Sequence, residues 1–326
     1  MVPARKMSRR LPAWALAMAL LVPGVALLAA CGRDTAEEGH AQAAQVDPVF
    51  LAGLEAWRLQ RVVDLLRPDG WASLVGLHWL QLKAHYVGSG ERIGNGVRFA
   101  FGPEKMGMVS RDEAGRYAFT PESGLELTAN GEPLKGRVAL RSDHDEVPTV
   151  IGFDAGKGQM SLIQRGDRHA LRIRHADAPT RLQYAGLQYW PADPSWRIEA
   201  RFVPSPVGTT LAVGDIIGTE SLSPSPGAVE FERDGQTWRL QALGEPGRDL
   251  FLVFADGTSG HGSYPAGRFL DAAWPDEEGR VVLDFNRAYN PPCVFTLFAT
   301  CPLPPAENRI NLPVPAGEKN YVAKVH

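Results

Sequence analysis

The sequence predicts a mostly β protein, with two β-sandwich or barrel-like subdomains preceded by one N-terminal helix. Three observations support this fold class. Short apolar stretches recur at a spacing of roughly ten residues and are separated by turn residues. The 326 residues include 34 glycines and 26 prolines, which suits many tight connections. One segment near the N-terminus has the longer periodicity of an amphipathic helix.

The expected helix begins at Asp47-Pro48, because aspartate is favoured at the N-cap and proline at the first helical position. Apolar residues then recur at helical spacing: Phe50, Leu51, Leu54, Trp57, Val62, Leu65 and Leu66. Pro68-Asp69-Gly70 ends the pattern. We expect this helix to pack on the sheet that follows.

Two series of expected strands follow the helix. The first comprises residues 71–80, 97–101, 106–110, 116–119, 125–128, 138–140, 149–153, 160–164 and 169–174. The second comprises residues 184–190, 196–202, 210–216, 229–231, 238–242, 250–254 and 281–285. Asn130-Gly131 and Asp234-Gly235 are typical hairpin turns. A break near Asp177-Ala178-Pro179 divides the series, so we expect one β subdomain over 47–178, together with the helix, and another over 179–326.

The first 31 residues have the pattern of an exported bacterial lipoprotein. Four basic residues within 5–10 precede an uncharged stretch that ends in Leu28-Ala29-Ala30-Cys31. This ending resembles the lipobox, which implies cleavage before Cys31 and a lipid on its thiol. We therefore expect a signal peptide over 1–30, a lipid anchor at Cys31 and a flexible tether over 31–46. A single transmembrane anchor is the alternative for the same stretch.

A lipid anchor places the protein in the cell envelope, with the membrane as a partner. Gly32 stands where aspartate would signal retention at the inner membrane, so we expect the outer membrane, facing the periplasm, in a host with two membranes. Removing the four basic residues of the signal changes the net charge from −3 to −7 and leaves no basic patch, so nucleic acid is not an expected partner. No cofactor fingerprint or metal-ligand spacing is present, so we expect neither a cofactor nor a metal.

Polar side chains with chemical potential are densest near the C-terminus. The candidates for a ligand or catalytic site are Asp256, His261, Tyr264, Arg268, Asp284, Asn286, Arg287, Tyr289, Asn290 and Asn308. Several follow a buried strand that ends at Asp284, and strand ends on a rigid scaffold often carry functional groups. A polar network that merely holds a long C-terminal loop is the alternative, and the sequence leaves both interpretations open.

Cys293 and Cys301 are the two cysteines that remain once Cys31 is assigned to the lipid. In an oxidising compartment they can form a disulfide, and otherwise they are a thiol pair. A nucleophilic thiolate needs a nearby base. A Cys293–His261–Asp256 arrangement is one conceivable source of that base.

Several of these motifs resemble the domain-of-unknown-function family 1684. The stretches concerned are 264–270, 284–293 and 299–308, together with 70–80 and 87–90. The resemblance extends over nearly everything from Trp57 to Lys319. The family is bacterial and archaeal, and the resemblance implies no particular reaction. It includes chains without an export signal, which keeps a thiol role open for the two cysteines.

We therefore expect a membrane-anchored protein that binds a small polar or envelope-derived ligand in a C-terminal pocket. The expected lining is Arg268, Asp284, Asn286, Arg287 and Asn290. The alternative is a hydrolase or transferase that uses the same Asp/Arg/Asn/Cys cluster. The sequence does not decide between an enzyme and a binding protein.

Overall fold

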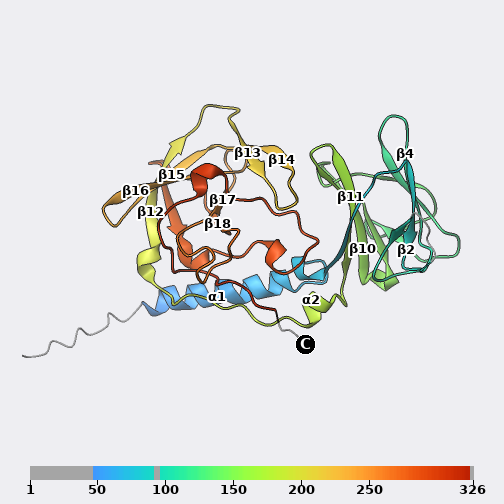
Figure 1. Ribbon diagram of the computed structural model, residues 1–326, viewed down its shortest axis with the longest axis horizontal. Coiled ribbons are helices and arrows are strands. Elements are labelled where there is room, and N and C mark those ends of the chain that lie inside the picture. The colour runs from blue at the N-terminus through green and yellow to red at the C-terminus, as the bar shows by residue number, and fades with distance from the viewer. Residues whose placement is uncertain (1–46, 92–95, 324–326) are drawn as a thin grey trace, which may run out of the picture. The chain divides into compact units, whose positions relative to one another are not determined.

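The computed structural model describes residues 47–91 and 96–323, and their fold is mostly β, as predicted (Figure 1). The predicted signal peptide, the lipid anchor at Cys31 and the tether over 31–46 lie outside the described residues. Among the helices in the described part of the chain, none has the length and apolar character needed to cross a membrane.

Helix α1, Pro48–Leu65, begins where the sequence predicts. The Asp47 carboxylate accepts a hydrogen bond from the backbone N–H of Val49 at 2.9 Å, which satisfies a donor that the helix itself leaves unpaired. A second, short helix is α2, Pro179–Leu182. The described residues also contain six 3-10 turns: η1 Trp71–Ser73, η2 Asp154–Gly156, η3 Pro194–Trp196, η4 Phe285–Arg287, η5 Pro292–Val294 and η6 Ala306–Asn308.

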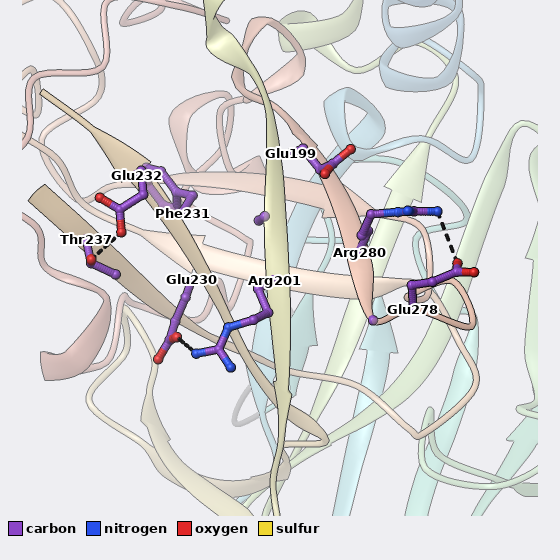
Figure 2. Close-up of a pocket in the computed structure, with 10 residues that line it drawn as sticks. Glu199, Arg201, Glu230, Phe231, Glu232, Thr237, Glu278 and Arg280 are labelled. Carbon is purple, nitrogen blue, oxygen red and sulfur yellow. Dashed lines mark hydrogen bonds and ion pairs between the residues drawn. The ribbon is translucent and has the colours of Figure 1, made fainter. Parts of the chain in front are cut away.

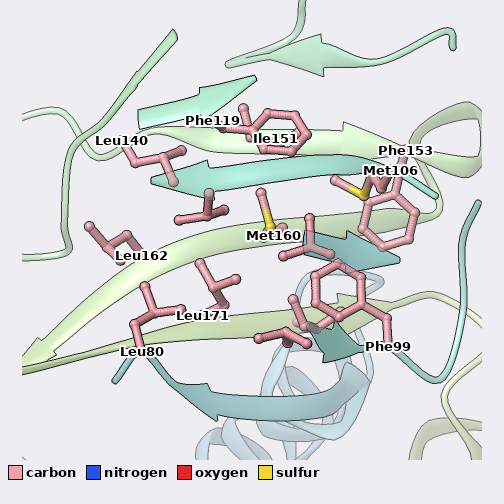
Figure 3. Packing of buried hydrophobic residues seen from close by; sticks show 14 of the residues in the cluster. Leu80, Phe99, Met106, Phe119, Leu140, Ile151, Phe153, Met160, Leu162 and Leu171 are labelled. Atoms are coloured by element: carbon pink, nitrogen blue, oxygen red, sulfur yellow. The ribbon is translucent and has the colours of Figure 1, made fainter. Parts of the chain in front are cut away.

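The first half of the described chain forms two sheets around one core. The six-stranded sheet has the order β1-β11-β10-β9-β6-β7 and the five-stranded sheet the order β3-β2-β4-β5-β8. The bounds are β1 Leu74–Trp79, β2 Ala84–Gly88, β3 Val97–Arg98, β4 Gly107–Arg111, β5 Tyr117–Pro121, β6 Thr128–Ala129, β7 Glu132–Pro133, β8 Val138–Leu140, β9 Val150–Phe153, β10 Gly158–Arg165 and β11 Arg168–His175. Figure 3 shows Met160 and Leu171 of the first sheet packing with Phe119 and Leu140 of the second. This half is therefore a sandwich, as predicted.

The second half contains a four-stranded sheet and two hairpins. The sheet has the order β16-β15-β12-β19, and the hairpins are β13-β14 and β17-β18. The bounds are β12 Arg197–Pro204, β13 Thr210–Gly214, β14 Glu220–Pro224, β15 Gly227–Arg233, β16 Gln236–Ala242, β17 Leu250–Phe254, β18 Arg268–Ala272 and β19 Arg280–Asp284. Phe285 lies at the centre of its core, with ring centroids of Trp196, Phe231 and Phe254 within 5.9 Å.

A third apolar cluster draws on both halves. Leu74 and Trp71 pack in it with Val253, Phe269 and Cys301. The described residues accordingly form one compact unit, and the predicted boundary near residue 178 stays a prediction. This shared cluster matters for function because the cavity described below lies beside it.

The prediction of a strand over residues 184–190 was wrong. The segment forms a single isolated bridge, between Tyr189 and Glu318, and no ladder. Its aromatic side chains pack individually instead. The ring of Tyr184 stacks on Tyr321, and the guanidinium of Arg58 lies 4.2 Å from the centroid of Tyr189. The alternation of aromatic residues in this segment therefore reflects individual side-chain packing and not strand pairing.

Candidate functional site

A cavity of about 310 Å³, here called the arginine cavity, lies where α1, the end of β10 and the 289–302 segment meet. It combines two guanidinium groups, four aromatic rings, a hydroxyl and a thiol. Its lining is Arg61, Trp71, Arg165, Phe251, Phe269, Tyr289, Pro292, Thr300, Cys301 and Pro302. A cavity of this volume suits a small molecule.

Arg61 is held in place by residues of the C-terminal segment. Its Nε donates to the Glu318 carboxylate at 3.0 Å, and its Nη2 donates to the carbonyl of Asn290 at 2.9 Å. The guanidinium also lies 4.6 Å from the centroid of the Tyr289 ring. Glu318 is fully buried, and burial raises the pKa of its carboxyl while Arg61 opposes that shift. These contacts fix the orientation of Arg61 at the cavity wall.

Arg165 and Thr300 form the polar corner of the cavity. Gly166, with φ of +58°, makes the turn after β10 and leaves Arg165 at the strand end. The Nε of Arg165 donates to Thr300 Oγ1 at 2.8 Å, and its Nη1 donates to Asp143 at 2.8 Å. Thr300 Oγ1 also accepts a bond from Arg172 at 3.3 Å. With two donors on its oxygen, the Thr300 hydroxyl proton is left to donate to a ligand.

Arg172 stands behind this corner and is the least expected group of the site. It is 5% exposed, and among the described residues no carboxylate forms an ion pair with it. Its Nε is buried without a hydrogen-bond partner, and its guanidinium lies 5.4 Å from the centroid of the Trp71 ring. Burial, with smaller contributions from the charges of Arg165 and Arg174, lowers the pKa of Arg172 to about 10, so it stays cationic at neutral pH.

The β11 register explains why Arg172 points this way. Leu171 and Ile173 enter the core of the N-terminal sandwich, and the alternation of the strand therefore turns Arg172 and Arg174 to the other face. Trp71 covers both of these arginines from the side of the chain that leads into β1. Arg174 also has a buried Nε without a partner. Two cations are thus enclosed by tertiary packing.

Aromatic rings form the apolar part of the cavity. Phe269 contacts both Phe251 and Tyr289 edge to face, with centroids 4.9 Å and 5.7 Å apart. The Tyr289 hydroxyl donates to Asp271 at 2.9 Å, and burial raises the pKa of both groups. This bond fixes the Tyr289 ring against the cavity.

The two cysteines lie at the edge of the site as free thiols. Cys301 is 4% exposed and lines the cavity, while Cys293 is half-buried. The backbone N–H of Cys293 donates to the Sγ of Cys301 at 3.0 Å, and the Tyr264 hydroxyl lies 3.7 Å from the Sγ of Cys293.

Several predicted site residues are enclosed in the protein instead of lining a common pocket. Arg268 is fully buried and pairs with Asp256 at 2.8 Å. Asp256 also accepts bonds from the backbone N–H and the hydroxyl of Thr258. His261 is exposed in the turn that follows. Because the Asp256 carboxylate is taken up by Arg268 and Thr258, these contacts do not give His261 an orienting acid.

The predicted Asp284–Asn290 group is split between an exposed pair and buried amides. Asp284 accepts from the backbone of Asn286, at the start of η4, and pairs with half-exposed Arg287 at 3.4 Å. Asn286 is buried and bonds in both directions with the backbone of Asp193. Asn290 is also buried, and its amide donates to the carbonyl of Lys319. These contacts are those of a network that holds the C-terminal segment.

Asn308 has the same character. It is fully buried, accepts from the backbone of Gln241 and donates to the carbonyls of Gln241 and Val253. It therefore ties η6 to β16 and β17. Of the predicted set, Tyr289 and Cys301 line the arginine cavity, and Tyr264 and Cys293 stand beside it.

Sequence reasoning missed Arg61, Arg165, Arg172 and Thr300. The arginines of β10 and β11 alternate with core residues, which is also the pattern of a solvent-facing side. Their signal was weak, because only tertiary contacts with Trp71 and Thr300 enclose them. A pair of arginines two positions apart on one strand face, at 172 and 174, was the available hint.

A larger hollow of about 570 Å³ lies on the sheet of β12, β15, β16 and β19 (Figure 2). Figure 2 shows Arg201 directed at Glu230 and Arg280 at Glu278, and both are ion pairs. Glu232 accepts from the Thr237 hydroxyl. Ion pairs of this kind at the surface contribute little to stability, and their arrangement is that of an ordinary solvated sheet face. We therefore take the smaller arginine cavity as the candidate site.

Over residues 47–91 and 96–323, no group of three or more His, Cys, Asp or Glu side chains could hold an ion. The arginine cavity offers cationic donors, a hydroxyl and apolar rings, and no residue of its lining is acidic. This set of groups is suited to an anion with an apolar portion.

Comparison with known proteins supports the C-terminal resemblance. The family described as "Protein of unknown function (DUF1684)" matches residues 182–319. The solution NMR structure of an uncharacterised protein from Haloarcula marismortui is 30% identical over 43% of this chain and 78% of that chain, with a TM-score of 0.36. No curated protein matches the sequence. The matched range is shorter than the predicted 57–319 and leaves out Arg61, Arg165 and Arg172.

Proposed function

Because the chain belongs, through residues 182–319, to the DUF1684 family of proteins of unknown function, its activity must be inferred from the site, and we propose that it binds a small organic anion in the arginine cavity. The ligand carries a carboxylate or phosphate group next to an apolar portion. The two anionic groups share the chemistry that guanidinium recognises.

The observation that carries this proposal is the burial of Arg172 without an acidic partner. A buried, uncompensated charge is costly, because the protein interior solvates it poorly. An anion in the cavity would offset that cost through Arg165, Thr300 and the field of Arg172 itself. Arg61 and Arg165 each have a carboxylate neighbour, whereas Arg172 and Arg174 have no ion pair among the described residues. The site therefore has excess positive charge.

The remaining wall supports a ligand with an apolar part. Trp71, Phe251, Phe269 and Tyr289 present rings to the same space that the guanidinium groups enter. We favour binding over the hydrolase or transferase alternative, because these groups are hydrogen-bond donors and apolar surfaces, which are the means of recognition.

Ligand-induced stabilisation tests the proposal. The melting temperature of the protein is measured with hexyl phosphate, hexanoate, inorganic phosphate and neutral hexanol. We expect hexyl phosphate or hexanoate to raise it, since a ligand at a hundred times its Kd stabilises by about 2.7 kcal/mol. Hexanol should have a much smaller effect. Arg172→Met should weaken the binding of the anionic probe by about ten-fold or more.

Arg168→Met is the matched control, because Arg168 lies on the same strand but is exposed and packs on Trp79 instead. This variant should bind the anionic probes as the wild type does. Equal binding by Arg172→Met and the wild type would contradict the proposal. So would the absence of any shift with all three anionic probes.

We also propose that the protein is located at the cell envelope, where a lipid attached to Cys31 anchors it to the membrane. The support is the basic, apolar and Leu-Ala-Ala-Cys pattern of the first 31 residues. Incorporation of a labelled fatty acid in cells, lost in Cys31→Ala, is the expected result. An unlabelled wild-type protein would overturn this location and leave the ligand proposal untouched.

A further inference from the structure

Cys293 and Cys301 form a closely placed pair that the anion site does not require. Cys293 lies in η5, and Cys301 follows after a short segment that returns to it. Both are free, and the Sγ of Cys301 lies 3.0 Å from the backbone nitrogen of Cys293. The two side chains differ in exposure, since Cys301 is 4% exposed and Cys293 is half-buried. Cys293 is thus the more accessible thiol, and Cys301 presents little surface, at the wall of the arginine cavity.

The surroundings of Cys293 favour its thiolate. The hydrogen bond with Cys301 is the main cause that lowers the pKa of Cys293 to about 7, with a smaller contribution from Tyr264. The same contact, together with burial, raises the pKa of Cys301. Tyr264, whose own pKa burial raises, stays a phenol and can donate to the sulfur. The charge of Cys293 adds to the rise in the pKa of Cys301, and the charge of Arg172 opposes it.

We propose that Cys293 and Cys301 are a reversible dithiol, in which Cys293 reacts with small disulfides and Cys301 resolves the adduct. This modification site adjoins the arginine cavity, which Cys301 lines, and its chemistry does not require a bound anion. Its division of roles follows from exposure, because Cys293 is the more accessible sulfur and the nearly buried Cys301 lies next to it. The Tyr264 hydroxyl is the group positioned to stabilise the attacking sulfur.

The chemistry is thiol–disulfide exchange and needs a low-molecular-weight disulfide as oxidant. The Cys293 thiolate attacks one sulfur of that disulfide, forms a mixed disulfide and releases one thiolate. Cys301 then loses its proton to solvent or to the released thiolate, and attacks the Sγ of Cys293. The second thiolate leaves. One small disulfide is reduced to two thiols, and the two protein thiols are oxidised to one disulfide.

The geometry allows closure with a local movement. A disulfide requires Cα atoms within about 7 Å and an S–S bond of about 2 Å. The Sγ of Cys301 already lies at the backbone of Cys293, so closure mainly requires rotation of the two side chains.

The test uses the full chain with Cys31→Ser, so that Cys293 and Cys301 are the only cysteines. The reduced protein is treated with oxidised glutathione at neutral pH and its intact mass is measured. We expect a loss of two hydrogens, reversed by dithiothreitol. With Cys301→Ser added, one glutathione should remain on Cys293. With Cys293→Ser added, the folded protein should stay unmodified.

Two results would overturn the proposal: both thiols persisting in excess oxidised glutathione, or faster glutathione addition to Cys301 than to Cys293. The pH profile of alkylation gives a second reading that does not need Cys293 variants. In a Cys301→Ala background the midpoint for Cys293 should rise above that of the wild-type pair, because alanine removes the main hydrogen bond. Tyr264→Phe should raise it by a smaller amount. An unchanged midpoint in both would also overturn the assigned roles.

Discussion

Arg268 and Arg172 are both buried strand residues, yet their surroundings are opposite. Arg268, in β18, bonds to the Asp256 carboxylate and to the carbonyls of Val314, Ala316 and Glu318. Arg172, in β11, has one bond to Thr300, at 3.3 Å, and no ion pair among the described residues. The Nε atoms of both arginines are buried without a partner. Both arginines are therefore buried, and they differ in the number of carboxylate and carbonyl oxygens that accept their hydrogen bonds.

This difference separates a structural arginine from one that, in our proposal, acts through its charge on a ligand in the neighbouring cavity. Burial lowers the pKa of Arg268 too, but the charge of Asp256 opposes the shift. A paired charge stabilises the fold only when its partners are present, and removal of either partner leaves the other uncompensated. An unpaired charge has the reverse character: it costs stability in the free protein and gains a partner only when an anion binds.

The largest expected effect comes from breaking the paired region. Arg268→Met should lower the free energy of unfolding by about 3–5 kcal/mol, because it leaves the Asp256 carboxylate buried and removes the donor for three carbonyls. Urea denaturation of the variant and the wild type measures this difference. Asp256→Asn should lose a similar amount, since it leaves the Arg268 cation unpaired.

A loss below about 1 kcal/mol in both variants would contradict this account of Arg268, since that is the range of exposed pairs. The double variant Arg268→Met/Asp256→Asn sharpens the test. If the two groups act as a pair, the double variant should lose less free energy of unfolding than the two single variants lose in sum.

The fold was more predictable than the site, for reasons visible in particular residues. Asn130 and Asp234 have φ of +50° and +54°, and both begin the hairpin turns that the Asn-Gly and Asp-Gly pairs predicted. Leu171 and Ile173 face the core as alternation requires. These features depend on neighbours in sequence.

The arginine cavity depends on segments more than a hundred residues apart. Arg165 and Thr300 meet across 135 positions, and Arg61 and Glu318 across 257. No local pattern encodes such contacts. The predicted C-terminal candidates were chosen for chemical type, and type alone does not separate a side chain enclosed by backbone acceptors, such as Arg268, from one that lines a cavity.

The second prediction concerns the unpaired region. Arg172→Met should change the free energy of unfolding by no more than about 1 kcal/mol and can increase it, because methionine fills similar space without a buried charge. Urea denaturation without added anion measures this value. A loss as large as that of Arg268→Met would make Arg172 a structural residue. The Arg168→Met control should stay close to the wild type.

The smallest effect is expected where an arginine has a partner but little burial. Arg287 is half-exposed and its Nε lies 3.4 Å from the Asp284 carboxylate, too loosely placed for a strong bond. Arg287→Ala should therefore lower the free energy of unfolding by less than about 1 kcal/mol. This loss should be smaller still in high salt, because salt screens an exposed ion pair. Asp284→Ala should cost more, because this carboxylate also accepts the backbone N–H and the amide of Asn286. Urea denaturation at low and high salt compares the two. A larger loss for Arg287→Ala than for Asp284→Ala would mean that partners and burial do not rank the arginines of this protein, and the distinction between Arg268 and Arg172 would fail with it.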